Sequence, residues 1–208
     1  MVGSRIAVRF PIALDRAIAC DLVEGGGFVE RERRGARLVI ERARTLPDRV
    51  APGMRVLLCG LNPSLYAADA GVGFARPGNR FWPAALASGL LTVDRDPRHA
   101  LVGHGVGMTD LVKRASTRAD QIDRAEYVAG AARVARLCTL LSPRVLCVVG
   151  ITGWRIAVDK AAVMGVQPAR IGSTLVYLMA NPSGVNAHVT LADLAAELRT
   201  VTELADNC

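Results

Sequence analysis

The chain has 208 residues, of which 51% are hydrophobic and 22% are charged, and its formal net charge is +7. This composition excludes a disordered chain and is typical of one folded domain with a buried core. No apolar run reaches the roughly 20 residues of a membrane span, and charged residues interrupt the apolar runs near the N-terminus, so we expect neither a membrane segment nor a signal peptide. We therefore expect a soluble cytoplasmic protein, associated with the nucleoid if the source is bacterial.

The positive charge comes almost entirely from arginine, because Lys113 and Lys160 are the only lysines. The planar guanidinium group suits phosphate and carboxylate groups, so a surplus of this kind permits a polyanionic partner. An arginine-rich, high-GC genome produces the same surplus, and charge alone does not decide between these two interpretations.

The cysteines and histidines do not predict a metal centre. None of the five cysteines forms a Cys-x-x-Cys pair, and the three histidines are too scattered for a ligand set. Cys59 and Cys147 lie in apolar, strand-like runs and Cys138 on an apolar helical face, which is typical of buried cysteines. We expect no disulfide framework, no metal and no cofactor.

Residues 1–50 look like an appendage to the rest of the chain. Three consecutive glycines interrupt them at 25–27, and the charges of residues 30–44 alternate in sign, a pattern typical of a solvated helix. We expect a helical N-terminal appendage over residues 1–50, packed on the surface of a domain over residues 51–208.

Strands and helices alternate along the remainder of the chain. Short apolar runs bounded by Gly, Pro or polar residues predict buried strands, and apolar residues at helical spacing predict helices. We expect strands within residues 51–60, 105–112, 144–150 and 173–182, and helices over 80–89, 125–141 and 190–204. This order predicts an α/β fold, namely a three-layer α/β/α domain with a short, mainly parallel central sheet.

The tripeptide Asn-Pro-Ser follows two of the predicted strands. It occurs in GLNPS at residues 60–64 and in ANPSGVNAH at residues 180–188, and Asp110 lies at the end of a third strand. Ligands of parallel sheets bind outside the carboxyl ends of the strands. We therefore expect both loops and Asp110 to converge on one crevice.

The first of these loops opens a stretch whose side chains suit a planar heterocycle attached to phosphate. A proline stiffens the orientation of Asn62, Phe74 lies in a glycine-rich loop that lets backbone approach a ligand, and Arg76 and Arg80 have no acid between them. The alternative is that the aromatic residues belong to the core and Asn62 only forms a turn. We favour the core for Phe81 and Trp82, at the start of a predicted helix, and a ligand contact for Phe74.

These motifs resemble the mismatch-specific uracil/thymine-DNA glycosylase (Mug/TDG) family of the uracil-DNA glycosylase superfamily. The first motif of the family is Gly-Ile-Asn-Pro-Gly, and it is followed by an aromatic residue in a loop and then by Pro-x-Asn-Arg/His-Phe-Trp. In this chain GLNPS, Phe74 and PGNRFW match these three parts in order. Its second motif, Asn-Pro-Ser-Gly-Leu, is matched by NPSGV at 181–185, and the likeness covers roughly residues 45–200. The resemblance implies a uracil-DNA glycosylase-like fold and a monofunctional enzyme of base excision repair. Such an enzyme flips a nucleotide out of duplex DNA and hydrolyses its N-glycosidic bond, leaving an abasic site.

The resemblance also implies roles for individual residues. Asn62 would position the attacking water, Phe74 would stack on the flipped base, and backbone N–H groups near Leu61 and Phe74 would stabilise the negative charge of the departing base. The loop after the second motif would fill the gap in the duplex, with Val185 at its tip where the family usually has Leu. The expected base contacts are Leu61, Tyr66, Phe74 and Asn181, and the expected DNA contacts are Arg76, Arg80, Ser183, Gly184, Val185, Asn186 and His188. For His188 a plain surface position explains the sequence equally well.

Asp110 is not part of the pattern that the family shares, and two interpretations of it stay open. Its carboxylate could activate water or stabilise the cationic sugar, which would compensate for Asn62, because an amide orients water but takes no proton. Equally, Asp110 could cap the next helix or pair with Lys113 or Arg114.

Two departures from the uracil-selective branch of the superfamily narrow the expected substrate. That branch has an acid in the first motif, His in the second, and a Tyr two residues after the acid that blocks the thymine methyl group. Here Asn62 and Asn181 stand at the two places, and Tyr66 lies four residues after Asn62, beside Ala67 and Ala68. We expect a slower, roomier enzyme that prefers mismatched G:U, with weaker action on G:T or etheno-cytosine.

Two other functions stay open. A non-catalytic module that flips and holds a damaged base would form no abasic product. A nucleoside or nucleotide hydrolase acting on monomers would need no such gap-filling loop, and the chain lacks a G-x-x-x-x-G-K-[ST] phosphate loop. We expect a monomer, since a pocket and a gap-filling loop need no partner subunit.

Overall fold

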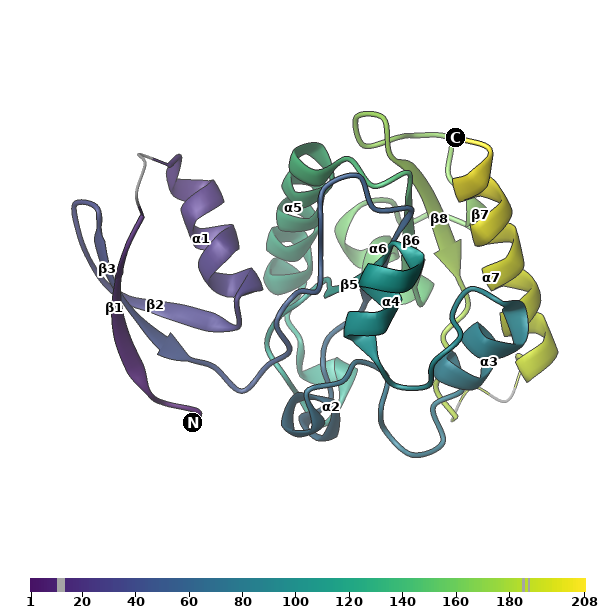
Figure 1. The fold of residues 1–208 in the computed structure, drawn as a ribbon, viewed down its shortest axis with the longest axis horizontal. Helices are drawn as coiled ribbons and strands as arrows, with labels where there is room; N and C mark the ends of the chain where they lie inside the picture. The colour runs from purple at the N-terminus through teal and green to yellow at the C-terminus, as the bar shows by residue number, and fades with distance from the viewer. Residues whose placement is uncertain (11–13, 185, 187) are drawn as a thin grey trace.

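The computed structural model describes residues 1–10, 14–184, 186 and 188–208. Its centre is a five-stranded sheet of order β5-β4-β6-β8-β7 (Figure 1). These strands are β4 (Val56–Gly60), β5 (Val106–Asp110), β6 (Val145–Val149), β7 (Gly165–Val166) and β8 (Leu175–Met179). All neighbouring strands are parallel except β7, which pairs antiparallel with β8. The predicted α/β fold with a short, mainly parallel sheet is confirmed.

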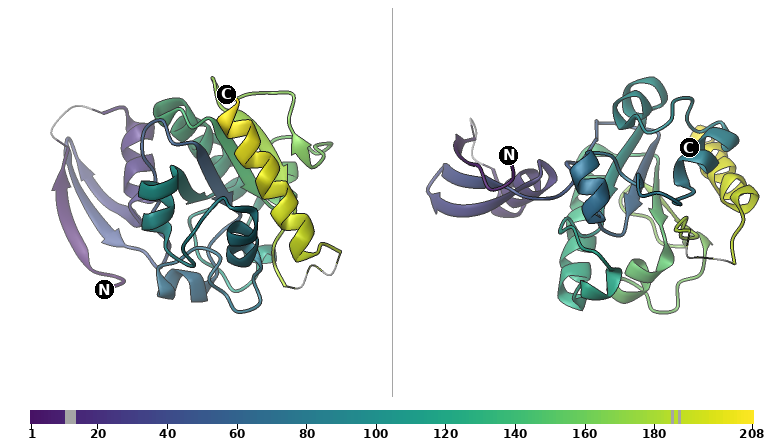
Figure 2. Two further views of the ribbon diagram at one scale, coloured as in Figure 1. Left: turned by 45° about the vertical axis from the view of Figure 1, so that its right-hand side comes forward. Right: turned by 90° about the horizontal axis from the view of Figure 1, so that it is seen from below.

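Helices cover both faces of this sheet because its strands are apolar on both sides. Alternate residues of β4 enter separate cores, Val56 and Leu58 into one and Leu57 and Cys59 into the other. The first core is closed by α3 (Phe81–Ser88) and α7 (Leu191–Asp206), and the second by α5 (Arg124–Leu141) and α6 (Ile151–Ala157) (Figure 2). The predicted three-layer arrangement follows from this alternation.

Capping residues set the ends of the long helices. Thr190 precedes α7 and accepts a hydrogen bond from the N–H of Asp193, and Asp123 precedes α5 and forms a capping box with Glu126. Both helices therefore lie close to their predicted bounds. The sequence pattern does not predict β7, α6, α2 (Leu65–Ala70), α4 (Pro97–His104) or the 3-10 turn Ala119–Gln121, since such short elements show too little periodicity.

The N-terminal appendage is mainly a small antiparallel sheet, which corrects the prediction of a helix over residues 30–44. β1 (Arg5–Arg9), β2 (Phe28–Arg34) and β3 (Arg37–Arg42) pair in the order β1-β3-β2, and α1 (Arg16–Gly25) packs on one face (Figure 2). The predicted helix is the β2–β3 hairpin, whose turn contains Gly35 with a φ of +58°. Leu38 and Ile40 lie two residues apart and both pack on Val23 of α1. This period of two decides for a strand over the helix that the alternating charges indicate.

The segment that follows β3 is tied to the main domain. Arg49 forms an isolated bridge with Met108, and the side chain of Asp48 is held between Lys113 and Arg133. By these contacts Asp48 and Arg49, which the sequence analysis assigns to the appendage, belong to the domain that carries the central sheet.

The cysteines agree with the prediction of buried thiols. Cys59, Cys138 and Cys147 lie in the two cores and are free. Within residues 1–10, 14–184, 186 and 188–208, no three His, Cys, Asp or Glu side chains are grouped closely enough to hold a metal ion. None of the helices in these ranges is long and apolar enough to cross a membrane.

Gly130 lets α5 lie against the loop that follows β5. A Cβ at this position would overlap the backbone carbonyl group of Leu111, which cannot move without shifting the end of β5. We expect Gly130→Ala to lower the free energy of unfolding by about 2 kcal/mol, even though alanine has the higher helix propensity. Urea unfolding followed by circular dichroism measures the change.

The matched control is Gly103→Ala in α4, where the new Cβ would meet only the side chain of His99. This variant should stay within about 1 kcal/mol of the wild type. Equal stability of the two variants would show that the close approach of α5 to the loop is not needed for the fold.

Candidate active site

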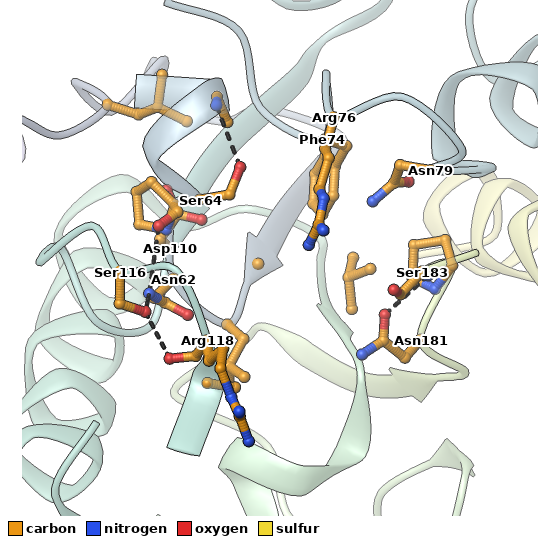
Figure 3. Close-up of a pocket in the computed structure, with 18 of the residues that line it drawn as sticks. Asn62, Ser64, Phe74, Arg76, Asn79, Asp110, Ser116, Arg118, Asn181 and Ser183 are labelled. Atoms are coloured by element: carbon orange, nitrogen blue, oxygen red, sulfur yellow. Dashed lines mark hydrogen bonds between the residues drawn. The ribbon is translucent and has the colours of Figure 1, made fainter. Parts of the chain in front are cut away.

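A cavity of about 350 Å³ opens at the carboxyl ends of the central strands (Figure 3). Both Asn-Pro-Ser loops and the end of β5 contribute to it, as the strand order predicts. The predicted site residues that line it are Leu61, Asn62, Phe74, Arg76, Asp110, Asn181 and Ser183.

One wall of the cavity consists of two loops that extend the pairing of β4 with β5. The N–H group of Leu111 donates to the carbonyl of Gly60 at 2.8 Å. The N–H group of Val112 donates to the carbonyl of Leu61 at 2.9 Å. Because these backbone groups are paired beyond the end of the strands, the side chains that follow each strand are held at fixed positions.

Asn62 presents an oxygen, rather than an N–H group, to the cavity. Its amide nitrogen donates to the Ser116 hydroxyl at 2.8 Å and to the Arg114 carbonyl at 3.1 Å. The Ser116 hydroxyl donates its single hydrogen to the Arg118 carbonyl, so toward Asn62 it must accept. This network orients the amide and leaves Asn62 Oδ1 on the cavity side, where it can accept a hydrogen bond (Figure 3).

Asp110 lies in the cavity wall with only 9% of its surface exposed. Burial raises the pKa of its carboxyl group from 3.8 to about 6, although the Lys113 ammonium opposes this rise. Of the structural alternatives for Asp110, the structure shows the ion pair with Lys113 but neither a helix cap nor a pair with Arg114 among the described residues. The next described helical turn begins only at residue 119. Arg114 pairs instead with Glu126 at 2.6 Å, and Lys113 lies 3.9 Å from Asp110 but 2.7 Å from Asp48.

Asp48 holds two cations next to Asp110 in a buried cluster. Its carboxylate oxygens accept from Lys113 Nζ at 2.7 Å and from Arg133 Nη1 at 2.8 Å. Burial opposes the ionisation of Asp48, but these ion pairs outweigh it and lower the pKa of Asp48. Arg133 also donates to the backbone carbonyl of Asp110 at 2.7 Å and to the Thr109 hydroxyl at 2.8 Å. The cluster therefore fixes the end of β5 and holds Lys113 closer to Asp48 than to the Asp110 carboxylate.

Phe74 is held over the end of β4 in a backbone conformation that aromatic residues rarely adopt, with a φ of +58°. The indole N–H of Trp82 donates to the carbonyl of Gly73 at 2.8 Å and fixes the loop. The Phe74 ring stacks on the buried Phe81 ring with centroids 4.3 Å apart, and a Cβ at Gly60 would lie 3.3 Å from it. Phe81 and Trp82 are core residues, as predicted, whereas Phe74 packs on the core and also lines the cavity.

Arg80 organises the second loop and does not line the cavity, and its predicted contact with DNA stays a prediction. Its guanidinium donates to the carbonyl groups of Ser183, Asn186 and Val189. Its backbone N–H donates to the carbonyl of Pro182 at 3.0 Å. Arg80 therefore joins the start of α3 to the loop after β8, while Arg76 extends toward the cavity (Figure 3).

Two further contacts shape the second loop. Asn181 Oδ1 accepts from the N–H of Ser183 at 2.9 Å, which leaves the amide nitrogen of Asn181 directed toward the cavity (Figure 3). Gly184 packs so closely on Gly78 that a Cβ on it would lie 2.6 Å from the Gly78 carbonyl oxygen. The loop thus has a glycine where it meets the turn before α3.

The structure does not place the other predicted contacts in the cavity. Tyr66 is 53% exposed on α2, and the cavity wall at this helix is Ala67. The predicted base contact of Tyr66 is therefore corrected. Asn186 and His188 lie beyond the residues that line the cavity, and His188 is exposed. Val185, the predicted tip, lies outside the described residues.

The cavity is also lined by five polar residues that were not predicted from the sequence: Ser64, Asn79, Ser116, Thr117 and Arg118. Ser64 caps α2, and Asn79 accepts from the first N–H group of α3. Ser116, Thr117 and Arg118 belong to the loop after β5. Ligands of parallel sheets bind at the carboxyl ends of the strands, which is the reason for expecting Asp110 in the site. The same reason applies to the polar residues that follow Asp110 in this loop.

These groups suit a neutral planar ring and the activation of water. Phe74 offers a ring to stack on, Asn181 an amide donor and Asn62 an acceptor. Asp110 is the cavity group that can take up a proton near neutral pH, and Arg76 brings a positive charge to the rim.

Comparison with known protein families gives an independent result. Residues 47–205 match the sequence model of the Uracil DNA glycosylase superfamily. The matched region contains Asp48, Asp110 and both Asn-Pro-Ser loops, and it leaves out the N-terminal sheet.

Proposed function

Since the chain belongs to the Uracil DNA glycosylase superfamily, whose members are DNA glycosylases, we propose that it removes uracil from G:U mismatches as a member of the mismatch-specific Mug/TDG branch. It would act as a monofunctional, monomeric enzyme of base excision repair that leaves an abasic site, with weaker activity on G:T and etheno-cytosine. The observation that carries this proposal is the oxygen of the neutral Asn62, fixed in the same cavity as the Asp110 carboxyl group.

The shape of the cavity supports a substrate range wider than uracil. Asn62 and Asn181 occupy the motif positions where the uracil-selective branch has an acid and a histidine. Tyr66 points away from the cavity and Ala67 lines it, so this wall has no ring that would exclude the methyl group of thymine. Preference for a mismatch would come from the lower cost of flipping a poorly paired base.

A few side chains would contact the face and the edge of the flipped base. Phe74, supported by Phe81 from behind, would stack on the ring. The Asn181 amide and the backbone N–H groups near Leu61 and Phe74 would donate to the carbonyl oxygens of the base. These donors matter most as the base departs, because it then carries negative charge.

Hydrolysis requires a water molecule next to the sugar. Asn62 Oδ1 would accept one hydrogen of this water, and Asp110 would accept the proton that the water loses. As the C1′–N1 bond breaks, its electron pair leaves with the base, and the water oxygen forms the new bond to C1′. The base then takes up a proton from solvent. An ionised Asp110 would also stabilise the cationic sugar before the water attacks.

A single-turnover assay tests the proposal on labelled duplexes with G:U, A:U or G:T and on single-stranded uracil DNA, with alkali to reveal abasic sites. We expect the fastest cleavage at G:U. Asn62→Ala should lower this rate about tenfold, which corresponds to the loss of one hydrogen bond worth about 1.4 kcal/mol. Tyr66→Ala is the control and should cleave at the wild-type rate, because Tyr66 lies outside the cavity.

The outcomes separate the three functions. If duplex DNA is bound but no abasic product forms, the protein is a binding module and not an enzyme. If free nucleosides or nucleotides are hydrolysed and duplex DNA is not bound at moderate salt, the protein is a hydrolase that acts on monomers.

A further inference from the structure

One face of the N-terminal sheet carries a row of three arginines. Arg9 on β1 lies opposite Arg37 on β3, and Arg37 lies opposite Arg34 on β2. Residues directly opposite each other in an antiparallel sheet point to the same face, so this arginine row (Arg9, Arg34 and Arg37) crosses all three strands. Leu38, next to Arg37, points to the other face, which α1 covers. All three arginines are exposed.

The charge of the arginine row is hardly compensated. Among the ion pairs of the described residues, none brings a carboxylate within 4.0 Å of Arg9 or Arg37. Arg34 has Glu32 at 3.9 Å, but the two side chains are 86% and 58% exposed, so solvent screens this pair. Like charges opposite each other on neighbouring strands destabilise a sheet. Repulsion within the row therefore opposes folding, and a bound anion would relieve it.

The other end of the same sheet is different. There Glu41 accepts from both Arg5 and Arg31 at 2.8 Å, so one carboxylate offsets part of the charge of the two arginines. Beside the arginine row the neighbouring side chains are small, and Ala7 and Ala36 line a shallow depression of about 420 Å³ with the arginines. Small neighbours let an extended anion approach the guanidinium groups.

We propose that the arginine row binds the phosphate backbone of duplex DNA at a distance from the base-flipping cavity. This rests on the proposed function, because it takes the flank of the substrate duplex as the ligand. Duplex DNA is the polyanion on which the superfamily acts, and guanidinium groups bind phosphate through paired hydrogen bonds. The three-stranded sheet stands beside the main domain (Figure 1), and none of its residues lines the cavity. A duplex would therefore have to extend beyond the flipped base to reach the arginine row.

The test compares binding of a short and a long G:U duplex, about 12 and about 30 base pairs, by fluorescence anisotropy at several salt concentrations. The variant carries Arg9→Gln, Arg34→Gln and Arg37→Gln together. We expect its Kd for the long duplex to rise at least tenfold, and the slope of log Kd against log salt to fall by about 2 to 3, because each lost phosphate contact removes about one. Binding of the short duplex and its cleavage at saturating enzyme should stay within twofold of the wild type.

A matched control has the same net charge as the triple variant of the arginine row. Lys160→Gln, Arg170→Gln and Arg199→Gln together also remove three exposed positive charges, but from scattered positions on the main domain. A second variant, with lysine at the three positions of the row, keeps the charge and should recover most of the binding.

Two results would overturn the proposal. One is a long-duplex Kd and salt slope equal to those of the control triple variant. The other is an equal loss on the short and long duplexes, which would place the row at the cavity or in the fold. Failure of the proposed function is seen separately, as absence of abasic product, since binding of the long duplex does not depend on cleavage.

Discussion

Replacement of Asp110 by asparagine should lower single-turnover cleavage of G:U duplex by about a hundredfold or more at neutral pH. The proposed role of Asp110 is to accept the proton of the attacking water, and general base catalysis contributes factors of about 10² to 10⁴. Asparagine has nearly the same shape but takes no proton. Asn62 cannot substitute for the lost carboxylate, because it is also an amide.

The dependence of the rate on pH identifies the group responsible. Burial raises the pKa of Asp110 to about 6, and the carboxylate is the active form. Cleavage by the wild type should therefore rise as the pH passes through about 6 and level off above it, and Asp110→Asn should lose this step. Asp94→Asn, at an exposed aspartate outside the cavity, is the control for loss of charge. A variant at Asp110 that keeps the wild-type rate and pH profile would exclude a catalytic role.

The same substitution should stabilise the fold at pH 7. Since the pKa of Asp110 rises from 3.8 to about 6 in the folded protein, the folded state binds this proton more tightly than the unfolded chain does. The carboxyl group therefore costs stability increasingly as the pH rises through this interval, and the full cost is present above it. The gain of Asp110→Asn in free energy of unfolding is at most about 3 kcal/mol at pH 7 and should nearly vanish at pH 4. Urea unfolding at the two pH values measures it.

Replacement of Asp48 by asparagine should have the largest effect on stability, a loss of about 3 to 5 kcal/mol in free energy of unfolding at pH 7. Asp48 faces Lys113 and Arg133, whose side chains are only 4% and 3% exposed. Without the carboxylate these two buried cations would keep only longer contacts, Lys113 with Asp110 and Arg133 with Glu24, each at 3.9 Å. The pKa of Asp48 is lowered, so its contribution is complete above its ordinary value of 3.8 and is lost as the pH falls below it.

The control for Asp48 is Asp21→Asn. Asp21 also pairs with an arginine of α5, Arg136, at 2.7 Å, but that arginine side chain is 42% exposed. An exposed pair of this kind contributes about 1 kcal/mol or less. Urea unfolding of both variants at pH 7 compares them. A similar, small loss in the two would show that water reaches the Asp48 cluster and screens it.

The sequence predicts those residues of the candidate site that directly follow a strand. Asn62, Asp110 and Asn181 each follow an apolar run, and the carboxyl ends of parallel strands lie together at one edge of the sheet. No knowledge of side-chain packing is needed for this step. The core positions of Phe81 and Trp82 follow in the same way from their place at the start of a helix.

What the sequence leaves undetermined depends on contacts between distant segments. Arg80 has no acid near it in the sequence, but in the fold its two Nη groups donate to three carbonyl groups more than one hundred residues away. Tyr66 is two residues from Ser64, which lines the cavity, yet the helical turn directs it outward. In residues 30–44 the charges indicate a helix, and only packing of Leu38 and Ile40 on α1 decides for strands.

The position of Asp48 limits how this protein can be divided. Asp48 directly follows the linker from the N-terminal sheet, but its partners Lys113 and Arg133 belong to the main domain and adjoin the catalytic carboxylate proposed here. A chimaera in which the N-terminal unit is exchanged up to residue 50 would remove the anion and leave both cations behind. Exchange up to residue 46 would retain it. The part of the N-terminal unit that can be exchanged therefore ends before Asp48. The sheet can diverge or be lost while Asp48, whose charge holds Lys113 and Arg133 beside the reaction site, is retained.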